Sequence, residues 1–387
     1  QGRGLAPFVE TVNGASTLLQ GVDDRGEIST SGYYVQQNFN YKSIVNLTGA
    51  LRVDGSSVFG EDQRNQKYFK ASGSYVISEH EFWKNMNMSK VWNFAKIRVA
   101  YGQSGNLTGI GAYSRFNSYS SNSFVSRTSL ISSGTLANTN VKPERQQELE
   151  FGLDLGFFKD RLTLQTNIYT KKVTDLLINR FIAPTNGFSS LLDNFGSLEN
   201  RGFEIVLTGK PVQNKNFDWT VTGIFNHNRN KAVRIGQALT LLSTNAGAPI
   251  AIIEGQPIGV FYGAFFALDA NGGLVKNGSG FPQGERGVQN SALVFTPQRD
   301  PVTGLPITTF PLVRKVLGDP NPDYTASLVN EITFKKLSLR VQLDAVQGLE
   351  VWNADWRTRQ GVGNGKEAEK EQTGVYPRGY INSFYGT

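Results

Sequence analysis

The sequence contains no cysteine and only two histidines, His80 and His227. Without cysteine the chain has no disulfide framework, zinc ribbon or thiol chemistry. Two separated histidines are too few for a histidine-based metal centre, and the serines of Asp54–Ser57 have no neighbouring histidine to act as the base of a serine triad. We therefore expect no catalytic residue, no bound metal and no cofactor, and the chain is not predicted to be an enzyme.

The sequence also lacks any run of about 18 apolar residues, which excludes a transmembrane helix. The mean hydropathy of -0.31 is still compatible with a membrane β-barrel, because barrel strands expose only every second residue to lipid. The formal net charge of +7 is spread along the chain without a block of Lys or Arg. This distribution predicts a solvated surface and no binding of nucleic acid.

The clearest pattern that is present runs from Glu144 to Asn228, where apolar and polar residues alternate. Such alternation is typical of β-strands with one apolar and one polar face. Each run is about 10 residues long, the length of a tilted strand that crosses a bilayer. The apolar positions are Leu149, Phe151, Leu153, Leu155, Leu162, Leu164, Ile168, Phe203, Ile205, Leu207, Phe217, Trp219, Val221 and Phe225.

The same alternation predicts six further strands, which bring the total to about ten. They are Ser31–Tyr41, Val45–Val53, Phe69–Ile77, Ile97–Tyr101, Tyr324–Phe334 and Leu337–Val346. The weakly patterned Gln1–Ile28 precedes them. The other segments are predicted as loop-like connections, with at most a short helical turn in the second of them: Asp54–Tyr68, Ser78–Phe94, Gln103–Lys142, Val173–Asn200, Arg229–Pro322 and Gln347–Thr387.

These connections alternate in length between the two ends of the strands. If the turn at Tyr41–Lys42 lies on the inner side, the inner side also receives Ser78–Phe94, Lys159–Arg161, Pro211–Asn216 and Lys335–Lys336. Every long connection then falls on the outer side, as short periplasmic turns and long extracellular loops require. The assignment holds only if Arg229–Pro322 contains no strand or an even number, and Ile258–Leu268 is a candidate for one of a pair.

Several stretches of the sequence also carry a resemblance to a known family. They are TSGYYVQQNFNYKS (30–43), LRVDGSSVFG (51–60), ISEHEFW (77–83), KIRVAYGQSGN (96–106), NVKPERQQELEFGLDLGFFKDRL (140–162), NRGFEIVLTGKPV (200–212), EGQPIGVFYG (254–263), GDPNPDYTAS (318–327) and LEVWN (349–353). Together they resemble the SusC/RagA group of TonB-dependent outer-membrane transporters of the Bacteroidota.

The resemblance implies an all-β fold, a transmembrane antiparallel up-and-down β-barrel of about 22 strands with long extracellular loops. Residues 1–387 would form a portion of the transmembrane barrel domain. The family's N-terminal plug domain, its TonB-contacting segment and the final C-terminal strands are not in this sequence. The implied location is the bacterial cell outer membrane, and the implied function is import of oligosaccharides or peptides. The implied partners are outer-membrane lipid, a SusD-like surface lipoprotein, and TonB through the missing N-terminal region.

Aromatic and basic residues in the outer connections are the candidates for binding cargo or the lipoprotein partner. They are Tyr113, Phe116, Tyr119, Phe188, Trp352, Trp356, Arg357 and Arg359. Aromatic rings can stack on sugar rings, and Trp and Arg often dominate interface energetics. Two alternatives stay open. The aromatic residues can pack the loops against one another, and Trp352 and Trp356 can belong to the aromatic girdle at the membrane boundary.

Two carboxylates on one strand face, Glu150 and Asp154, are predicted to line the lumen. Their strand spacing of roughly 13 Å is beyond the separations that glycosidases use. The alternative function for the whole chain is that of a structural or adhesive β-rich surface protein with Ser-rich loops. Such a protein would fold in water, would have no lipoprotein partner and would have no transport role.

Overall fold

The computed structural model describes residues 2–5, 15–18, 25–106, 109–124, 127–236, 239–243 and 250–381. The chain forms two compact units. The first unit is Gln1–Asn228 with Ala326–Asp344, and the second unit is Arg229–Thr325 with Ala345–Thr387. No helix among the described residues is long and apolar enough to cross a membrane.

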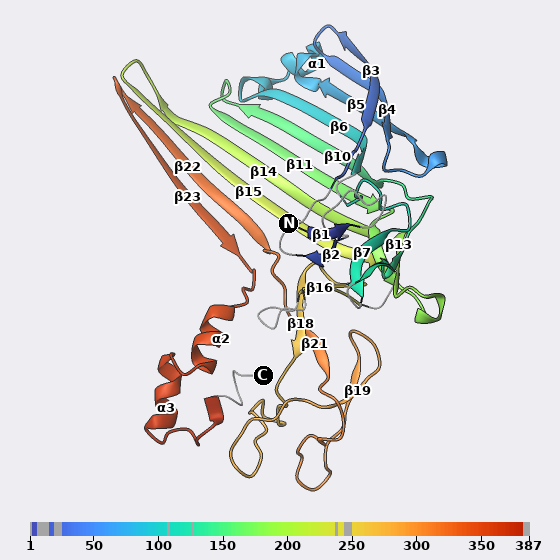
Figure 1. The fold of residues 1–387 in the computed structure, drawn as a ribbon. Helices are drawn as coiled ribbons and strands as arrows, with labels where there is room; N and C mark the ends of the chain where they lie inside the picture. The colour runs from blue at the N-terminus through green and yellow to red at the C-terminus, as the bar shows by residue number, and fades with distance from the viewer. Residues whose placement is uncertain are drawn as a thin grey trace. The chain divides into compact units, whose positions relative to one another are not determined.

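Ten long strands of the described chain lie side by side in one sheet, in the order β23-β22-β15-β14-β11-β10-β6-β5-β4-β3 (Figure 1). The pairings from β3 to β14 are all antiparallel. All ten strands predicted from the alternating pattern are confirmed, and most extend beyond the pattern. Their bounds are β3 (Thr30–Tyr41), β4 (Val45–Ser56), β5 (Asn65–Val76), β6 (Trp92–Asn106), β10 (Glu144–Phe157), β11 (Leu162–Thr174), β14 (Ser197–Gln213), β15 (Phe217–Arg234), β22 (Tyr324–Phe334) and β23 (Leu337–Gln347).

The register of this sheet places apolar and polar side chains on opposite faces. Leu153 pairs with Ile97 and Thr166, whereas the next residue, Asp154, pairs with Lys96 and Gln165. Because successive strand residues project to opposite faces, the apolar residues of β10 share one face with those of its neighbours. Phe151 on this face is 55% exposed and Ile168 is 63% exposed. An exposed apolar face is the surface that a β-barrel presents to lipid.

The inner ends of the strands are joined by tight turns and by a short helical segment. The turn from β10 to β11 has left-handed backbone at Phe158, Lys159 and Asp160. Asn93 holds this turn, because its Oδ1 accepts from the Lys159 amide and its Nδ2 donates to Asp160. The β5–β6 connection contains the predicted short helix, α1 (Glu81–Lys84).

Aromatic rings gather beside α1 at the same end of the strands. The Trp83 and Trp92 rings meet edge to face with centroids 4.5 Å apart, and Trp92 stacks on Phe157 at 5.9 Å. Aromatic residues at strand ends are typical of the boundary between membrane and water.

The N-terminal segment and the outer connections of the first unit contain short strands that the alternating pattern did not predict. They are β1 (Gly2–Leu5), β2 (Ala15–Leu18), β7 (Tyr119–Phe124), β8 (Arg127–Ser132), β9 (Thr135–Leu136), β12 (Leu177–Phe181) and β13 (Ser190–Asn194). β1 pairs with β2, β7 pairs with β8, and β12, β13 and β9 form a small sheet. The prediction of Gln103–Lys142 and Val173–Asn200 as loops was therefore wrong in part. The predicted connection Asp54–Tyr68 is also shorter, because β4 reaches Ser56 and β5 begins at Asn65.

Three of these outer connections pack on one another through a small apolar cluster, the loop core. It consists of the buried residues Val58, Phe59, Ile110 and Val141, and Leu177 and Leu192 of the third connection pack against them. Gly60 allows the close approach, since a β-carbon there would lie 2.3 Å from the carbonyl oxygen of Thr139. The loop core gives the outer side of the first unit a fixed structure.

The second unit contains the connection between β15 and β22. Its described residues form β16 (Leu239–Ser243), β17 (Ile250–Ile253), β18 (Val260–Ala264), β19 (Gly287–Gln289), β20 (Phe295–Pro297) and β21 (Arg314–Gly318). These six strands form two separate small sheets and do not enter the ten-stranded sheet. The described part of this connection therefore adds no strand to the ten-stranded sheet, which meets the condition set for the assignment of the long connections to one side. The predicted paired strand within Ile258–Leu268 is β18.

The C-terminal segment Gln347–Thr387 was predicted as loop-like, and its described part instead contains two short helices. They are α2 (Ala354–Gly361) and α3 (Glu369–Gln372). The side chain of Asn353 caps α2 by accepting from the Trp356 amide at 2.8 Å. Helices this short have little room for an apolar period, so the prediction missed them.

Candidate functional site

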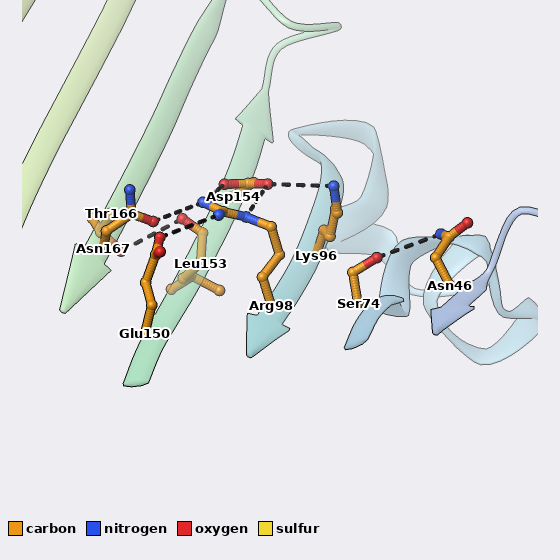
Figure 2. Close-up of polar contacts among 9 residues, drawn as sticks. All are labelled: Asn46, Ser74, Lys96, Arg98, Glu150, Leu153, Asp154, Thr166 and Asn167. Atoms are coloured by element: carbon orange, nitrogen blue, oxygen red, sulfur yellow. Dashed lines mark hydrogen bonds and ion pairs between the residues drawn. The ribbon is translucent and has the colours of Figure 1, made fainter. Parts of the chain in front are cut away.

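The polar face of the first unit carries a network of ion pairs around Arg98 of β6 (Figure 2). Arg98 donates from Nε and Nη2 to the two carboxylate oxygens of Asp154 in β10, at 3.0 and 2.8 Å. Its Nη2 also donates to Oδ1 of Asn167 in β11 at 2.9 Å. Lys96 lies 3.8 Å from Asp154, and Glu150 lies 3.8 Å from Arg98. Asp154 is thus held between two cations and Glu150 faces Arg98, so both carboxylates act as fixed charges on the polar face.

Gly152 makes this network possible. The register places it opposite both Arg98 and Asn167. A β-carbon at residue 152 would lie 2.6 Å from Cζ of Arg98. The guanidinium therefore crosses β10 to reach Asn167 only because residue 152 has no side chain.

Gly152→Val is expected to displace Arg98 and to destabilise the folded protein. Losing the paired geometry of a partly buried arginine costs about 1–3 kcal/mol. Gly102→Val is the matched control, because Gly102 lies on the same face and a β-carbon there would have no other atom within 4 Å. Thermal unfolding of the full-length protein in detergent measures the change in stability that each of the two substitutions causes. Equal unfolding temperatures for the two variants would contradict the role assigned to Gly152.

Two cavities open on the same polar face beside the network. One, of about 320 Å³, is lined by three carboxylates and one lysine: Glu148, Glu150, Glu204 and Lys171 are among its residues. The other, of about 240 Å³, includes Asn46, Ser74, Lys96 and Arg98 in its lining. Charged and amide groups on one face require water or a polar partner there, as the lumen of a barrel provides.

A third cavity, of about 430 Å³, lies between the outer connections of the first unit. Tyr113 and Phe116 line it, and they remain 55% and 47% exposed. Tyr119 in β7 and the half-buried Phe188 are not among its lining residues. The structure therefore brings two of the four predicted aromatic residues of this unit to one cavity, while the loops pack on one another through the loop core, whose buried residues include none of these four.

The other four predicted site residues belong to the second unit. Trp352 packs against Phe261 of β18 with ring centroids 6.0 Å apart. Trp356, Arg357 and Arg359 lie in α2, where Trp356 is 40% exposed. Trp352 thus contributes to packing, whereas Trp356 and Arg359 present side chains at the surface.

Ion pairing and ring stacking hold the helical segment after α2. Lys370 Nζ donates to Glu367 at 2.6 Å, and this hydrogen bond lowers the pKa of the Glu367 carboxyl and raises the pKa of Lys370. The Tyr376 and Tyr380 rings stack at 4.3 Å, and Tyr380 is buried beside Ala368. These contacts hold the segment in one conformation.

A hydrogen-bonded cluster in the second unit was missed by sequence reasoning. Asn321 donates to the Ile258 carbonyl at 3.0 Å and accepts from Asn230 at 2.7 Å. Asn230 accepts from the Ile258 amide at 2.6 Å, and Glu350 accepts from the Asp319 amide at 2.6 Å. Residues from three stretches that carry the family resemblance, EGQPIGVFYG, GDPNPDYTAS and LEVWN, come together in this cluster. The joint occurrence of these stretches was the sequence signal that could have predicted it.

The described residues contain no group of three or more His, Cys, Asp or Glu side chains placed to hold a metal ion. The two histidines have other surroundings. His80 contacts the Tyr75 hydroxyl and stacks on Phe82, and the His227 ring lies 5.3 Å from that of Phe203.

Long antiparallel strands with an exposed apolar face, an ion-paired polar face and long connections at one edge define the wall of a transmembrane β-barrel. The model of the TonB-dependent receptor-like β-barrel family matches residues 4–258. The chain belongs to this family.

Individual relatives agree with this placement. TonB-dependent receptor P3 of Formosa agariphila is 28% identical over 351 residues, which are 88% of this chain and 34% of that receptor. TonB-dependent receptor SusC of Bacteroides thetaiotaomicron is 28% identical over 52% of this chain and 21% of its own length. The structure of the RagAB peptide transporter shares the fold, with a TM-score of 0.69 and 21% identity over 97% of this chain and 40% of that chain. The chain spans about a third of the length of the first of these curated relatives.

Proposed function

We propose that this chain forms part of the wall of a TonB-dependent importer in the bacterial outer membrane. The observation that carries the proposal is the ten-stranded sheet, whose exposed apolar face suits lipid and whose charged face suits an aqueous lumen. Cargo too large for porins, an oligosaccharide or a peptide, would be captured at the outer connections together with a SusD-like surface lipoprotein. Release into the periplasm would be driven by TonB.

The proposal assigns residues 1–387 to a portion of the barrel domain. The plug that contacts TonB and the strands that complete the barrel would be supplied elsewhere in the polypeptide. The chain's share of about a third of its curated relative supports this division. No catalytic step is assigned to the chain, since its paired charges on the polar face are held in structural contacts.

Growth of the source bacterium tests the transport function. Deletion of the gene should abolish growth on one oligosaccharide or peptide mixture as sole nutrient, and depletion of TonB should abolish growth on the same nutrient. The adhesive alternative makes the opposite prediction. If the deletion strain grows on every nutrient tested and loses only attachment to surfaces, the protein is an adhesin.

Trp356→Ala combined with Arg359→Ala is expected to weaken co-purification of the surface lipoprotein. Both side chains lie in α2, a surface segment in which an aromatic ring and an arginine provide typical interface groups. Pull-down of the lipoprotein with the full-length protein measures the loss. The folded fraction of the same preparation is measured as the control for barrel assembly. Reduced barrel assembly with normal lipoprotein binding in the folded fraction would instead place these residues at the membrane boundary.

A further inference from the structure

The cavity between the outer connections of the first unit has an uncharged, hydroxyl-rich lining. Its volume of about 430 Å³ falls within the range of about 300–1,000 Å³ typical of small-molecule sites. No Asp, Glu, Lys or Arg is among the described residues that line it. Its polar side chains are Ser114, Ser118, Ser133, Thr135 and Asn179.

Two exposed aromatic rings complete the cavity. Tyr113 and Phe116 are each about half exposed, so their rings meet water that a ligand would release. The face of an aromatic ring is electron-rich, and it attracts the weakly positive C–H groups on the face of a sugar ring. The guanidinium carbon of Arg115 lies 4.2 Å from the centroid of the Phe116 ring, and this contact helps to fix the ring.

Some polar groups of the lining are occupied by the protein and others are available. Ser114 accepts from the Gly111 amide, Ser133 accepts from the Thr135 amide, and Thr135 bonds to Ser190. The side chains of Ser118 and Asn179 form no hydrogen bond with the described part of the chain. An amide offers two donors and one acceptor oxygen, and a hydroxyl offers both roles, which matches the paired donor and acceptor character of sugar hydroxyls.

The walls of the cavity are held by the fold and need little ordering on binding. Ile110, just before the segment with Tyr113 and Phe116, is buried in the loop core. The Phe116 amide donates to the Tyr113 carbonyl at 2.9 Å. Leu192, which also lines the cavity, packs against the same loop core. A site held by a packed scaffold loses less entropy when a ligand binds.

We propose that this cavity is a subsite for an uncharged sugar residue, so that the cargo is a neutral oligosaccharide. The inference rests on the proposed import function and specifies its cargo. The termini of a free peptide and the carboxylates of an acidic glycan need charged partners, and none is among the described lining residues. The adjacent Arg115 lies with its guanidinium against the Phe116 ring. The arginine on β12, Arg180, is already paired with Asp193 at 3.3 Å.

The test measures direct binding of saccharide and peptide probes to the full-length protein, purified in detergent, by titration calorimetry. The probes are the neutral hexasaccharides of the malto, cello, xylo, manno and laminari series, with hexa-alanine and hexagalacturonate as charged comparators. At least one neutral hexasaccharide should bind, and the charged probes should not. Tyr113→Ala and Phe116→Ala should each weaken the binding about tenfold, a change equivalent to 1.4 kcal/mol.

Asn179→Ala provides a second variant without loss of an aromatic ring, and it should also weaken binding. Phe181→Ala is the matched control, because Phe181 is an exposed aromatic residue outside the cavity lining. It should change the dissociation constant by less than about twofold. Failure of every neutral probe to bind overturns the proposal, and so does binding that survives Tyr113→Ala combined with Phe116→Ala.

This outcome is separable from the outcome for import, because binding is measured without cells. Sugar binding with the expected variant pattern, in a protein whose loss leaves growth unchanged, would refute import and retain the subsite. TonB-dependent growth on peptides, without binding of any neutral sugar, would retain import and refute the subsite.

Discussion

Leu153→Arg in β10 is expected to block assembly of the protein in a membrane. Leu153 is the middle residue of the apolar run Leu149, Phe151, Leu153, Leu155 and Phe157 on the exposed face of the sheet. An arginine that faces lipid costs about 2–4 kcal/mol near the middle of the bilayer. The folded fraction is measured by the heat-dependent shift in gel mobility, and the stability by urea unfolding in lipid bilayers.

Gln165→Arg is the matched control for this substitution. Gln165 lies on β11 directly opposite Asp154, so its side chain shares the polar face. The new arginine would have water and a carboxylate nearby and should leave the folded fraction close to that of the wild type. If the two variants assemble equally well, the assignment of the faces to lipid and lumen is wrong.

The period-two pattern predicted the ten-stranded sheet because burial of one face dictates every second residue. β10 shows this well, since Leu149 to Leu155 alternate with Glu150, Gly152 and Asp154 along a strand of 14 residues. A long strand repeats its pattern often enough to be distinguished from chance. The facing of these residues follows directly from the same alternation.

The short strands of the outer connections escaped prediction for a physical reason. β12 and β13 have five residues each, and β9 has two. Their pairing depends on contacts between segments far apart in the chain, such as the parallel pairing of Ser190 with Thr135. Tertiary contacts of this kind leave little trace in local sequence.

The residues of the candidate site were likewise predicted only in part from the sequence. Tyr113 and Phe116 were predicted as aromatic residues of an outer connection, and the structure places both at one cavity. Asn179, a polar group of that cavity, comes from a different connection and has no sequence signal of its own. Side chains converge at a site through packing of the loop core, and composition alone does not show which loops meet.

Arg299→Met is expected to unfold the part of the second unit around residues 265–313. Glu285 is buried, with only 5% of its side chain exposed. Arg299 donates from Nε to Glu285 at 3.2 Å and also from Nη2 to the second carboxylate oxygen, and its Nη1 donates to the Leu268 carbonyl at 2.9 Å. Removing one partner of a buried ion pair leaves the other charge without compensation and costs about 3–5 kcal/mol.

Hydrogen exchange of backbone amides in the full-length protein measures this loss locally. Amides bonded around Glu285, such as that of Val313, which donates to the Glu285 carbonyl at 3.0 Å, should exchange faster. Arg359→Met is the surface control. Its ion pair with Asp355 is exposed on both sides, so removing it should change stability by at most about 1 kcal/mol.

The double variant Arg299→Met with Glu285→Leu separates the charge effect from the effect of altered shape. An apolar pair of similar volume removes the buried carboxylate together with its partner, and such replacements are often neutral or stabilising. We therefore expect the double variant to recover most of the protection that Arg299→Met loses. If the double variant exchanges as fast as the single variant, the contribution of Arg299 comes from its packing and its bond to Leu268, and the buried charge of Glu285 is not what the arginine stabilises.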